Sequence, residues 1–290
     1  MNAKNAISDE LGAHVSAGGG VQNAPARAAE INAANIQLFT KQPSRWAEPK
    51  IDEATAEAFK AAREEHGVVF AGAHDSYLIN LSSPDRKLWR MSQRCFQGEL
   101  QRCCTLGLDF MVMHPGNATD KDPEAGLVRN AEGVTESLEA VEGGTRVLLE
   151  LTAGSGTSVG ATFENLQAII EGIPESQRHR VGICFDTCHG YSAGYDLVND
   201  YDGVWDAFDE IIGLDRLGLI HMNDSQHPFG SRKDRHETIG AGTLGEAPFR
   251  RLMTDERLRH VPKILETPKG DDGAAADIRN LELLRSFRTS

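Results

Sequence analysis

Short apolar runs recur along the chain, and most of them end at a polar residue that can bind a metal ion. Six runs end in this way, at His74, His114, Glu150, Asp186, His221 and Glu266. Two further runs precede them, at residues 11–15 and 36–40. Each run is short and uncharged, which is typical of a parallel strand buried on both faces. The pattern therefore predicts eight strands.

The segments between these runs have the apolar spacing of helices. Val204, Phe208 and Ile211 follow one another at helical intervals in one segment, and glycines such as Gly107 separate helix from strand. Eight strand and helix units, in a chain slightly longer than the roughly 250 residues typical of the fold, predict a closed (β/α)8 barrel. The carboxyl ends of barrel strands share one face, so the six polar residues are expected to converge there.

Length and composition predict one domain over residues 1–290, because 40% of the 290 residues are hydrophobic and no Ser/Pro-rich linker divides them. No apolar stretch approaches the ~20 residues of a membrane span. Residues 1–10 are polar, so we expect a cytoplasmic protein with no membrane partner. The five cysteines lack disulfide-framework spacing and are expected to be reduced. Cys188 is not expected to bind metal, although it lies between Asp186 and His189.

The net charge of −13 argues against a protein that coats nucleic acid through bulk electrostatics. Basic residues nevertheless gather in the loops that follow the predicted strands. They are Lys41, Arg45, Arg232, Lys233, Arg235 and Lys269. With bound divalent cations added to that face, a phosphate-bearing substrate is compatible with an acidic chain.

The ligand types favour a particular class of metal. Imidazole and carboxylate ligands together suit zinc, manganese or iron, whereas Mg²⁺ rarely takes imidazole and structural zinc favours cysteine. One catalytic zinc takes about three protein ligands, so six strand-end ligands predict at least two ions that share a carboxylate. His189, just past the sixth strand, and Asp234 with His236 have the number and chemistry for a third ion.

The motifs resemble those of the endonuclease IV family of apurinic/apyrimidinic endonucleases along nearly the whole chain. The matching segments are GAHVS at 12–16, LFTK at 38–41, HDSYLINL at 74–81, HPG at 114–116, FDTCH at 185–189, HMND at 221–224, SRKDRH at 231–236 and LET at 265–267. The resemblance implies a xylose-isomerase-like TIM barrel and a metal-dependent DNA-repair enzyme. It also implies a monomer whose partner is duplex DNA with abasic sites.

The resemblance implies three zinc ions, one of which Mn²⁺ could replace, held by nine residues. His74, His114 and Glu150 would hold the first, with Glu150 bridging to a second completed by Asp186, His221 and Glu266; His189, Asp234 and His236 would hold the third. The implied reaction is hydrolysis of the phosphodiester bond 5′ of an abasic site, which leaves a 3′-hydroxyl and a 5′-deoxyribose phosphate. Glu150 is the predicted catalytic residue, which orients the attacking water or accepts its proton.

The resemblance also implies DNA contacts in two strand-end loops. Tyr77 and Leu78 would enter the minor groove and occupy the gap left by the missing base, while Lys41, Arg45 and Arg232 would contact DNA. Two positions depart from the family pattern: Ser44 stands where Arg is usual, and Leu151 where Asn is common. We expect the first to affect DNA penetration and the second to affect the orientation of Glu150.

A sugar isomerase or epimerase is the alternative, because related barrels hold one divalent ion with a Glu, Asp, His and Glu set. That activity explains Glu150, Asp186, His221 and Glu266, but not the second cluster at 189, 234 and 236. Among the other histidines, His14 is expected to make a structural hydrogen bond rather than bind metal. No role is assigned to His66, His179, His227 and His260.

Overall fold

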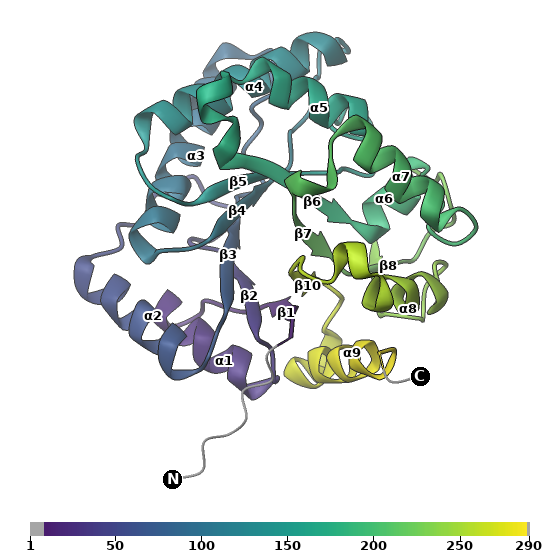
Figure 1. Cartoon of the computed structure of the whole chain (residues 1–290). Coiled ribbons are helices and arrows are strands. Elements are labelled where there is room, and N and C mark those ends of the chain that lie inside the picture. The colour runs from purple at the N-terminus through teal and green to yellow at the C-terminus, as the bar shows by residue number, and fades with distance from the viewer. Residues whose placement is uncertain (1–8, 289–290) are drawn as a thin grey trace.

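The barrel predicted from the sequence is confirmed in the computed structural model, which describes residues 9–288 (Figure 1). Eight parallel strands close on themselves in the order β1-β10-β7-β6-β5-β4-β3-β2. The strands are β1 (Leu11–His14), β2 (Asn35–Leu38), β3 (Phe70–His74), β4 (Phe110–Met113), β5 (Arg146–Glu150), β6 (Val181–Asp186), β7 (Leu217–His221) and β10 (Lys263–Leu265). A separate antiparallel pair, β8 (Asp224–Ser225) and β9 (His236–Glu237), follows β7 in the chain.

Helices surround the barrel (Figure 1). They are α1 (Ala24–Glu30), α2 (Glu53–Glu65), α3 (Arg86–Leu106), α4 (Pro123–Ala140), α5 (Phe163–Gly172), α6 (Thr187–Ala193), α7 (Tyr201–Ile211), α8 (Ala247–Thr254) and α9 (Ala274–Ser286). Several helices are preceded by an N-cap residue whose side chain accepts a hydrogen bond from a main-chain N–H of the first turn. These residues are Asp52 for α2, Asp85 for α3, Asp122 for α4 and Thr162 for α5. Gly107 ends α3 in a left-handed conformation, with φ of 70°.

Alternation along the strands aims the predicted ligands at the barrel axis. Alternate side chains of a barrel strand point inward. Phe110, Val112, Leu148, Cys184, Leu219 and Ile264 form one buried apolar cluster contributed by five strands. Except for Phe110, each residue of this cluster is followed two positions later by a predicted ligand. The first such pair is Val112 with His114, and the last is Ile264 with Glu266. These side chains therefore lie one layer above the apolar floor of the barrel.

A larger core fills the space between the strands and the outer helices. Val147 and Leu149 of β5 belong to this core together with Phe163 and Phe208 of the helices. The apolar run that ends at His74 begins at Val68 in the sequence, but Val69 is 61% exposed and β3 begins only at Phe70. No helix within residues 9–288 combines the length and apolar character that crossing a membrane requires. All five cysteines are free.

Candidate metal centre

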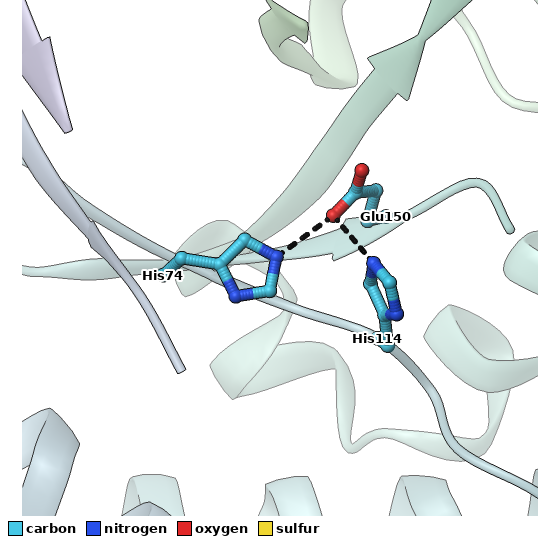
Figure 2. A group of neighbouring side chains, drawn as sticks. All are labelled: His74, His114 and Glu150. Carbon is cyan, nitrogen blue, oxygen red and sulfur yellow. Dashed lines mark hydrogen bonds and ion pairs between the residues drawn. The ribbon is translucent and has the colours of Figure 1, made fainter. Parts of the chain in front are cut away.

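Glu150 lies at the centre of the predicted ligands, and its two carboxylate oxygens face different imidazoles. The Nε2 atoms of His74 and His114 each lie 3.1 Å from Oε2 (Figure 2). On the other side, His221 Nδ1 lies 3.1 Å and His189 Nδ1 lies 3.2 Å from Oε1. Glu150 itself is fully buried at the end of β5. A carboxylate placed in this way is suited to bridge two metal ions.

The predicted ligands fall into three groups in which the ligand atoms lie within 4.8 Å of one another. The groups are His74, His114 and Glu150; then Glu150, Asp186, His221 and Glu266; and finally His189, Asp234 and His236. Glu150 belongs to the first two groups. The structure thus brings together, at one end of the barrel, all nine residues that the sequence predicts as ligands.

Four of the five imidazoles have one ring nitrogen, called the outer nitrogen, that faces an acceptor other than a predicted ligand atom, although the outer Nδ1 of His189 also lies 3.2 Å from Glu150 Oε1. These pairs are His74 with Asp75 O (3.0 Å), His189 with Leu151 O (3.0 Å), His221 with Gln37 Oε1 (2.9 Å) and His236 with Glu266 O (3.2 Å). Donation from the outer nitrogen leaves the inner nitrogen free, which is how metal-binding histidines are usually held. The inner Nε2 atoms of His189 and His236 are buried and face carboxylates of other predicted ligands, at 3.2 Å from Asp234 Oδ1 and 3.5 Å from Asp186 Oδ2. The nine residues therefore fit zinc in donor type and in orientation.

The third group is positioned by the start of α6 and by the β8–β9 pair. Asp186 caps α6, where its Oδ1 accepts the main-chain N–H of His189 at 2.8 Å. Ser225 of β8 pairs with His236 of β9, so the loop carrying Asp234 is folded back toward the barrel. Buried Asp224 accepts main-chain N–H groups from Gly240, Gly242 and Leu244 and so holds the segment that follows β9. Within the loop itself, Ser192 Oγ of α6 donates to the main-chain oxygen of Lys233 at 2.9 Å. The segment around Asp234 is therefore a folded structure braced at both ends.

The charges at this centre strongly perturb one another. Burial alone would raise the pKa of Glu150, but His114 and His221 hold it well below its usual value. Burial would lower the pKa of His74 and His189, but neighbouring carboxylates raise both well above the usual value. Protons on the imidazoles therefore balance the carboxylates where metal ions would otherwise do so.

Sequence reasoning missed the residues that orient the ligands. Gln37 of β2 is fully buried, and its amide donates to Glu266 Oε1 at 2.6 Å while its oxygen faces His221. Asn223 donates to Asp186 Oδ2 at 2.7 Å and accepts from the main-chain N–H of Glu266. The sequence did contain a signal for Gln37, because it is a polar residue within the apolar run that predicts the second strand. His14 lies outside all three groups, and its Nδ1 lies 3.1 Å from Gln37 Nε2 and 3.5 Å from Glu266 Oε1.

Comparison with known proteins agrees with this geometry. The family model of the xylose isomerase-like TIM barrel matches residues 25–286. A probable endonuclease 4 from Geobacter sulfurreducens is 47% identical over 282 residues, which cover 96% of this chain and 94% of the relative. The chain belongs to the endonuclease IV family. A crystal structure of endonuclease IV from Thermus thermophilus superposes with a TM-score of 0.85 at 36% identity, and the match covers 96% of this chain and 98% of that one.

Sugar epimerases share the barrel with the endonuclease IV family. The crystal structure of a D-tagatose 3-epimerase-like protein superposes with a TM-score of 0.71, covering 95% of this chain and 96% of that one. Its sequence is only 18% identical, so the similarity is one of fold alone.

Two cysteines lie beside the ligands of this endonuclease IV family member. Cys184 is within reach of Glu150 and His221, and Cys188 is within reach of Asp186 and His236. Burial raises the pKa of the Cys188 thiol to about 12, and its Sγ faces the main-chain oxygen of Arg235 at 3.6 Å. The thiol is thus occupied by a main-chain contact, and the second and third ligand groups already contain Asp186 and His236 without it. We therefore keep the prediction that Cys188 does not bind metal.

The residues predicted to contact DNA differ in exposure. Tyr77 is 70% exposed and packs edge-on against Phe39 with ring centroids 5.4 Å apart, at the rim of a cavity of about 340 Å³ that the ligand histidines also line. Leu78 beside it is partly buried. Arg45 and Arg232 are both exposed. Tyr77, Arg45 and Arg232 therefore lie at the surface, and Leu78 is partly accessible there.

Lys41 is placed differently from its prediction. Its side chain is only 1% exposed, and its Nζ lies 2.6 Å from Glu48 Oε1 and 2.9 Å from Cys95 Sγ. A lysine whose charge is already paired beneath a loop cannot also reach a DNA phosphate without leaving that pair. The prediction that Lys41 contacts DNA is therefore withdrawn, because loop position alone did not show that the side chain turns inward.

Leu151, the other departure from the family pattern, reaches the centre through its main chain. Its side chain is fully buried in the apolar core rather than directed at Glu150. Its main-chain oxygen is what reaches the centre, where it faces His189 Nδ1 at 3.0 Å. That contact does not depend on the side chain, so the departure from Asn leaves it intact.

Proposed function

We propose that this protein is a zinc-dependent AP endonuclease that hydrolyses the phosphodiester bond 5′ of abasic sites in duplex DNA. The products would be a 3′-hydroxyl and a 5′-deoxyribose phosphate. The observation that carries the proposal is the presence of three adjoining ligand groups, two of which share Glu150. Membership of the endonuclease IV family supports the same activity.

The proposed roles follow from the geometry of the residues. Zinc held by the three groups would acidify a bound water and stabilise charge on the phosphoryl and leaving oxygens. Glu150 would orient the attacking water, because it is ionised and its carboxylate lies 3.1 Å from His74 and His114, which line the cavity. The outer hydrogen bonds of the imidazoles fix their rings, so the ligand nitrogens need no rearrangement during the reaction.

Abasic DNA suits the rim of the site. A missing base offers no hydrogen bonds to read, so recognition must depend on how easily the sugar leaves the helix. Exposed Tyr77 stands where it could fill the gap, and Arg45 and Arg232 would attract the phosphate backbone. We also retain the predictions of one domain, a monomer, a cytoplasmic location and replacement of one zinc by Mn²⁺.

The sugar isomerase alternative is less well supported. A single ion over a small sugar would account for Glu150, Asp186, His221 and Glu266. It would leave His189, Asp234 and His236 without a function, although their ligand atoms form a group of their own. We therefore favour the nuclease.

The deciding experiment uses a labelled duplex with one abasic-site analogue. Purified protein, with or without chelator pretreatment, is incubated with this duplex and with an undamaged control, and the ends are scored by gel. We expect chelator-sensitive incision just 5′ of the lesion. Absence of incision in a protein carrying only one metal ion by elemental analysis would favour the sugar isomerase.

Tyr77→Ala is expected to weaken binding to the abasic duplex by about tenfold, since stacking of an aromatic side chain on bases contributes roughly 1–3 kcal/mol. Metal content should stay unchanged, because Tyr77 belongs to none of the ligand groups. Fluorescence anisotropy and elemental analysis measure the two quantities. Val69→Ala is the matched control, since it also trims an exposed apolar side chain but at the opposite end of β3. Loss of zinc from Tyr77→Ala would contradict the assigned role.

A further inference from the structure

One face of α3 is both polar and buried, which is unusual for an outer helix of a barrel. Cys95, Glu99 and Arg102 are 2%, 1% and 5% exposed, and Gly98 lies among them at helical spacing. We call these four residues the α3 platform. They contact the loop between β2 and α2 (residues 39–52) and the loop between β3 and α3 (residues 75–85). Those loops carry Arg45 and Tyr77, the side chains proposed above to probe DNA.

The platform binds the first loop through a chain of charged contacts. Arg102 Nη1 donates to Glu48 Oε2 at 2.6 Å, and Arg102 Nε donates to Thr40 Oγ1 at 3.1 Å. The other oxygen of Glu48 accepts from Lys41 Nζ, which in turn contacts Cys95 Sγ. Both ends of this loop segment, at residues 40–41 and at residue 48, are therefore attached to the same helix.

The platform binds the second loop as well, and the two loops bind each other. Glu99 Oε1 accepts the main-chain N–H of Ser76 at 3.1 Å. The hydroxyl of Ser76 donates to the main-chain oxygen of Pro43 in the first loop. Burial, together with nearby Asp75, raises the pKa of Glu99 to about 8. Ser76 is one residue before Tyr77, so the contact to Glu99 fixes the base of the probing side chain.

Gly98 makes this arrangement sterically feasible. A Cβ atom at this position would lie 2.5 Å from Glu48 Oε2 and 3.5 Å from Arg102 Nη1. Glycine in the middle of a helix is otherwise unfavourable relative to alanine. Its presence in a 21-residue helix is explained by the close approach of the Glu48 carboxylate.

We propose that the α3 platform positions the two DNA-probing loops over the metal centre and thereby sets the selectivity for abasic DNA. The part of this proposal that concerns selectivity rests on the proposed AP endonuclease function. The part that concerns the ordering of the two loops does not. A buried polar cluster is a costly way to gain stability, since apolar residues of similar volume often stabilise as well or better. Fixed geometry of the loops is what such a cluster can supply.

The test uses a substitution that should loosen the loops without weakening the fold. Gly98→Ala improves helix propensity yet displaces the Glu48 carboxylate from Arg102. Gly203→Ala is the matched control, because its Cβ would likewise meet a side-chain carboxylate, that of Asp200, on α7 across the barrel (Figure 1). Glu99→Leu removes the acceptor for Ser76, whereas Glu99→Gln retains one and should restore wild-type behaviour.

Three measurements are made on each variant. For Gly98→Ala and Glu99→Leu we expect KM for the abasic duplex to rise about tenfold, because misplaced loops would lose roughly 1.4 kcal/mol of binding to the duplex, which corresponds to a tenfold change in affinity. The kcat and the hydrolysis of bis(p-nitrophenyl) phosphate, which needs the metal centre but not the loops, should be unchanged. Hydrogen exchange should accelerate within residues 40–49 and 76–81 only.

The outcomes separate the two proposals. The positioning role would be overturned if Gly98→Ala and Glu99→Leu had the same KM and the same loop exchange rates as the Gly203→Ala control. Equal loss of kcat with both substrates would also overturn it, since the platform would then be supporting the metal centre. If wild-type protein does not incise abasic DNA, the proposed function fails, and the exchange data still decide whether the platform orders the loops.

Discussion

Replacing Glu150 by Gln is expected to lower kcat/KM for incision of abasic DNA by on the order of 10⁴-fold, the scale seen when a central catalytic group is removed. The amide has the size of the carboxylate but no charge, and only one of its two polar atoms can accept. Because the imidazoles of His74 and His114 face one oxygen and those of His189 and His221 face the other, the substitution affects both sides. Two of the three ligand groups would lose a member.

Elemental analysis and the incision assay together measure this effect. Metal content should fall along with activity, since a bridging ligand is lost. Glu237→Gln is the matched control, because Glu237 is adjacent to His236 in β9, its carboxylate accepts from the N–H of Thr238, and it enters no ligand group among residues 9–288. A Glu150→Gln protein with wild-type metal content and rate would refute both the bridging and the catalytic role.

The sequence predicted that the candidate ligands converge because two simple regularities act together. Strand side chains alternate with a period of two, and all barrel strands end on the same face. Once the apolar runs were assigned as strands, His114, Glu150 and His221 had to meet whatever the details of the intervening helices. Asp234 and His236 do not follow a barrel strand, and their location depends on the β8–β9 pair, which only the structure shows.

The contacts of the loops could not be predicted in the same way. Lys41 looks like an exposed basic residue in the sequence, but its partner Glu48 and the helix residue Cys95 bury it. The Arg102 that holds Glu48 lies 54 residues away in the chain. Such pairing depends on how the loop packs on α3, which no local period encodes. Gln37 was missed for a related reason, since its role depends on His221 and Glu266 on distant strands.

Zinc binding is expected to release protons and to weaken steeply as the pH falls. In the metal-free protein the carboxylates raise the pKa of His74 and His189 well above the usual value, although burial opposes the shift. Below these raised values the inner nitrogens carry protons, and zinc must displace them. Above these values the nitrogens are free. Zinc affinity should therefore drop about tenfold per pH unit for each proton displaced.

Calorimetry in two buffers of different ionisation enthalpy gives the number of protons released, and competition with a chelator at pH 6, 7 and 8 gives the affinity. His66→Gln is the control, since His66 ends α2 outside the ligand groups and should leave both results unchanged. The His189→Gln protein should release fewer protons on zinc binding and bind fewer zinc ions than wild type. The reason is that the third ligand group, to which His189 belongs, loses a ligand nitrogen while the other two groups keep theirs. Affinity independent of pH would mean that these imidazoles do not bind the metal, and the hydrolytic mechanism built on them would fail with it.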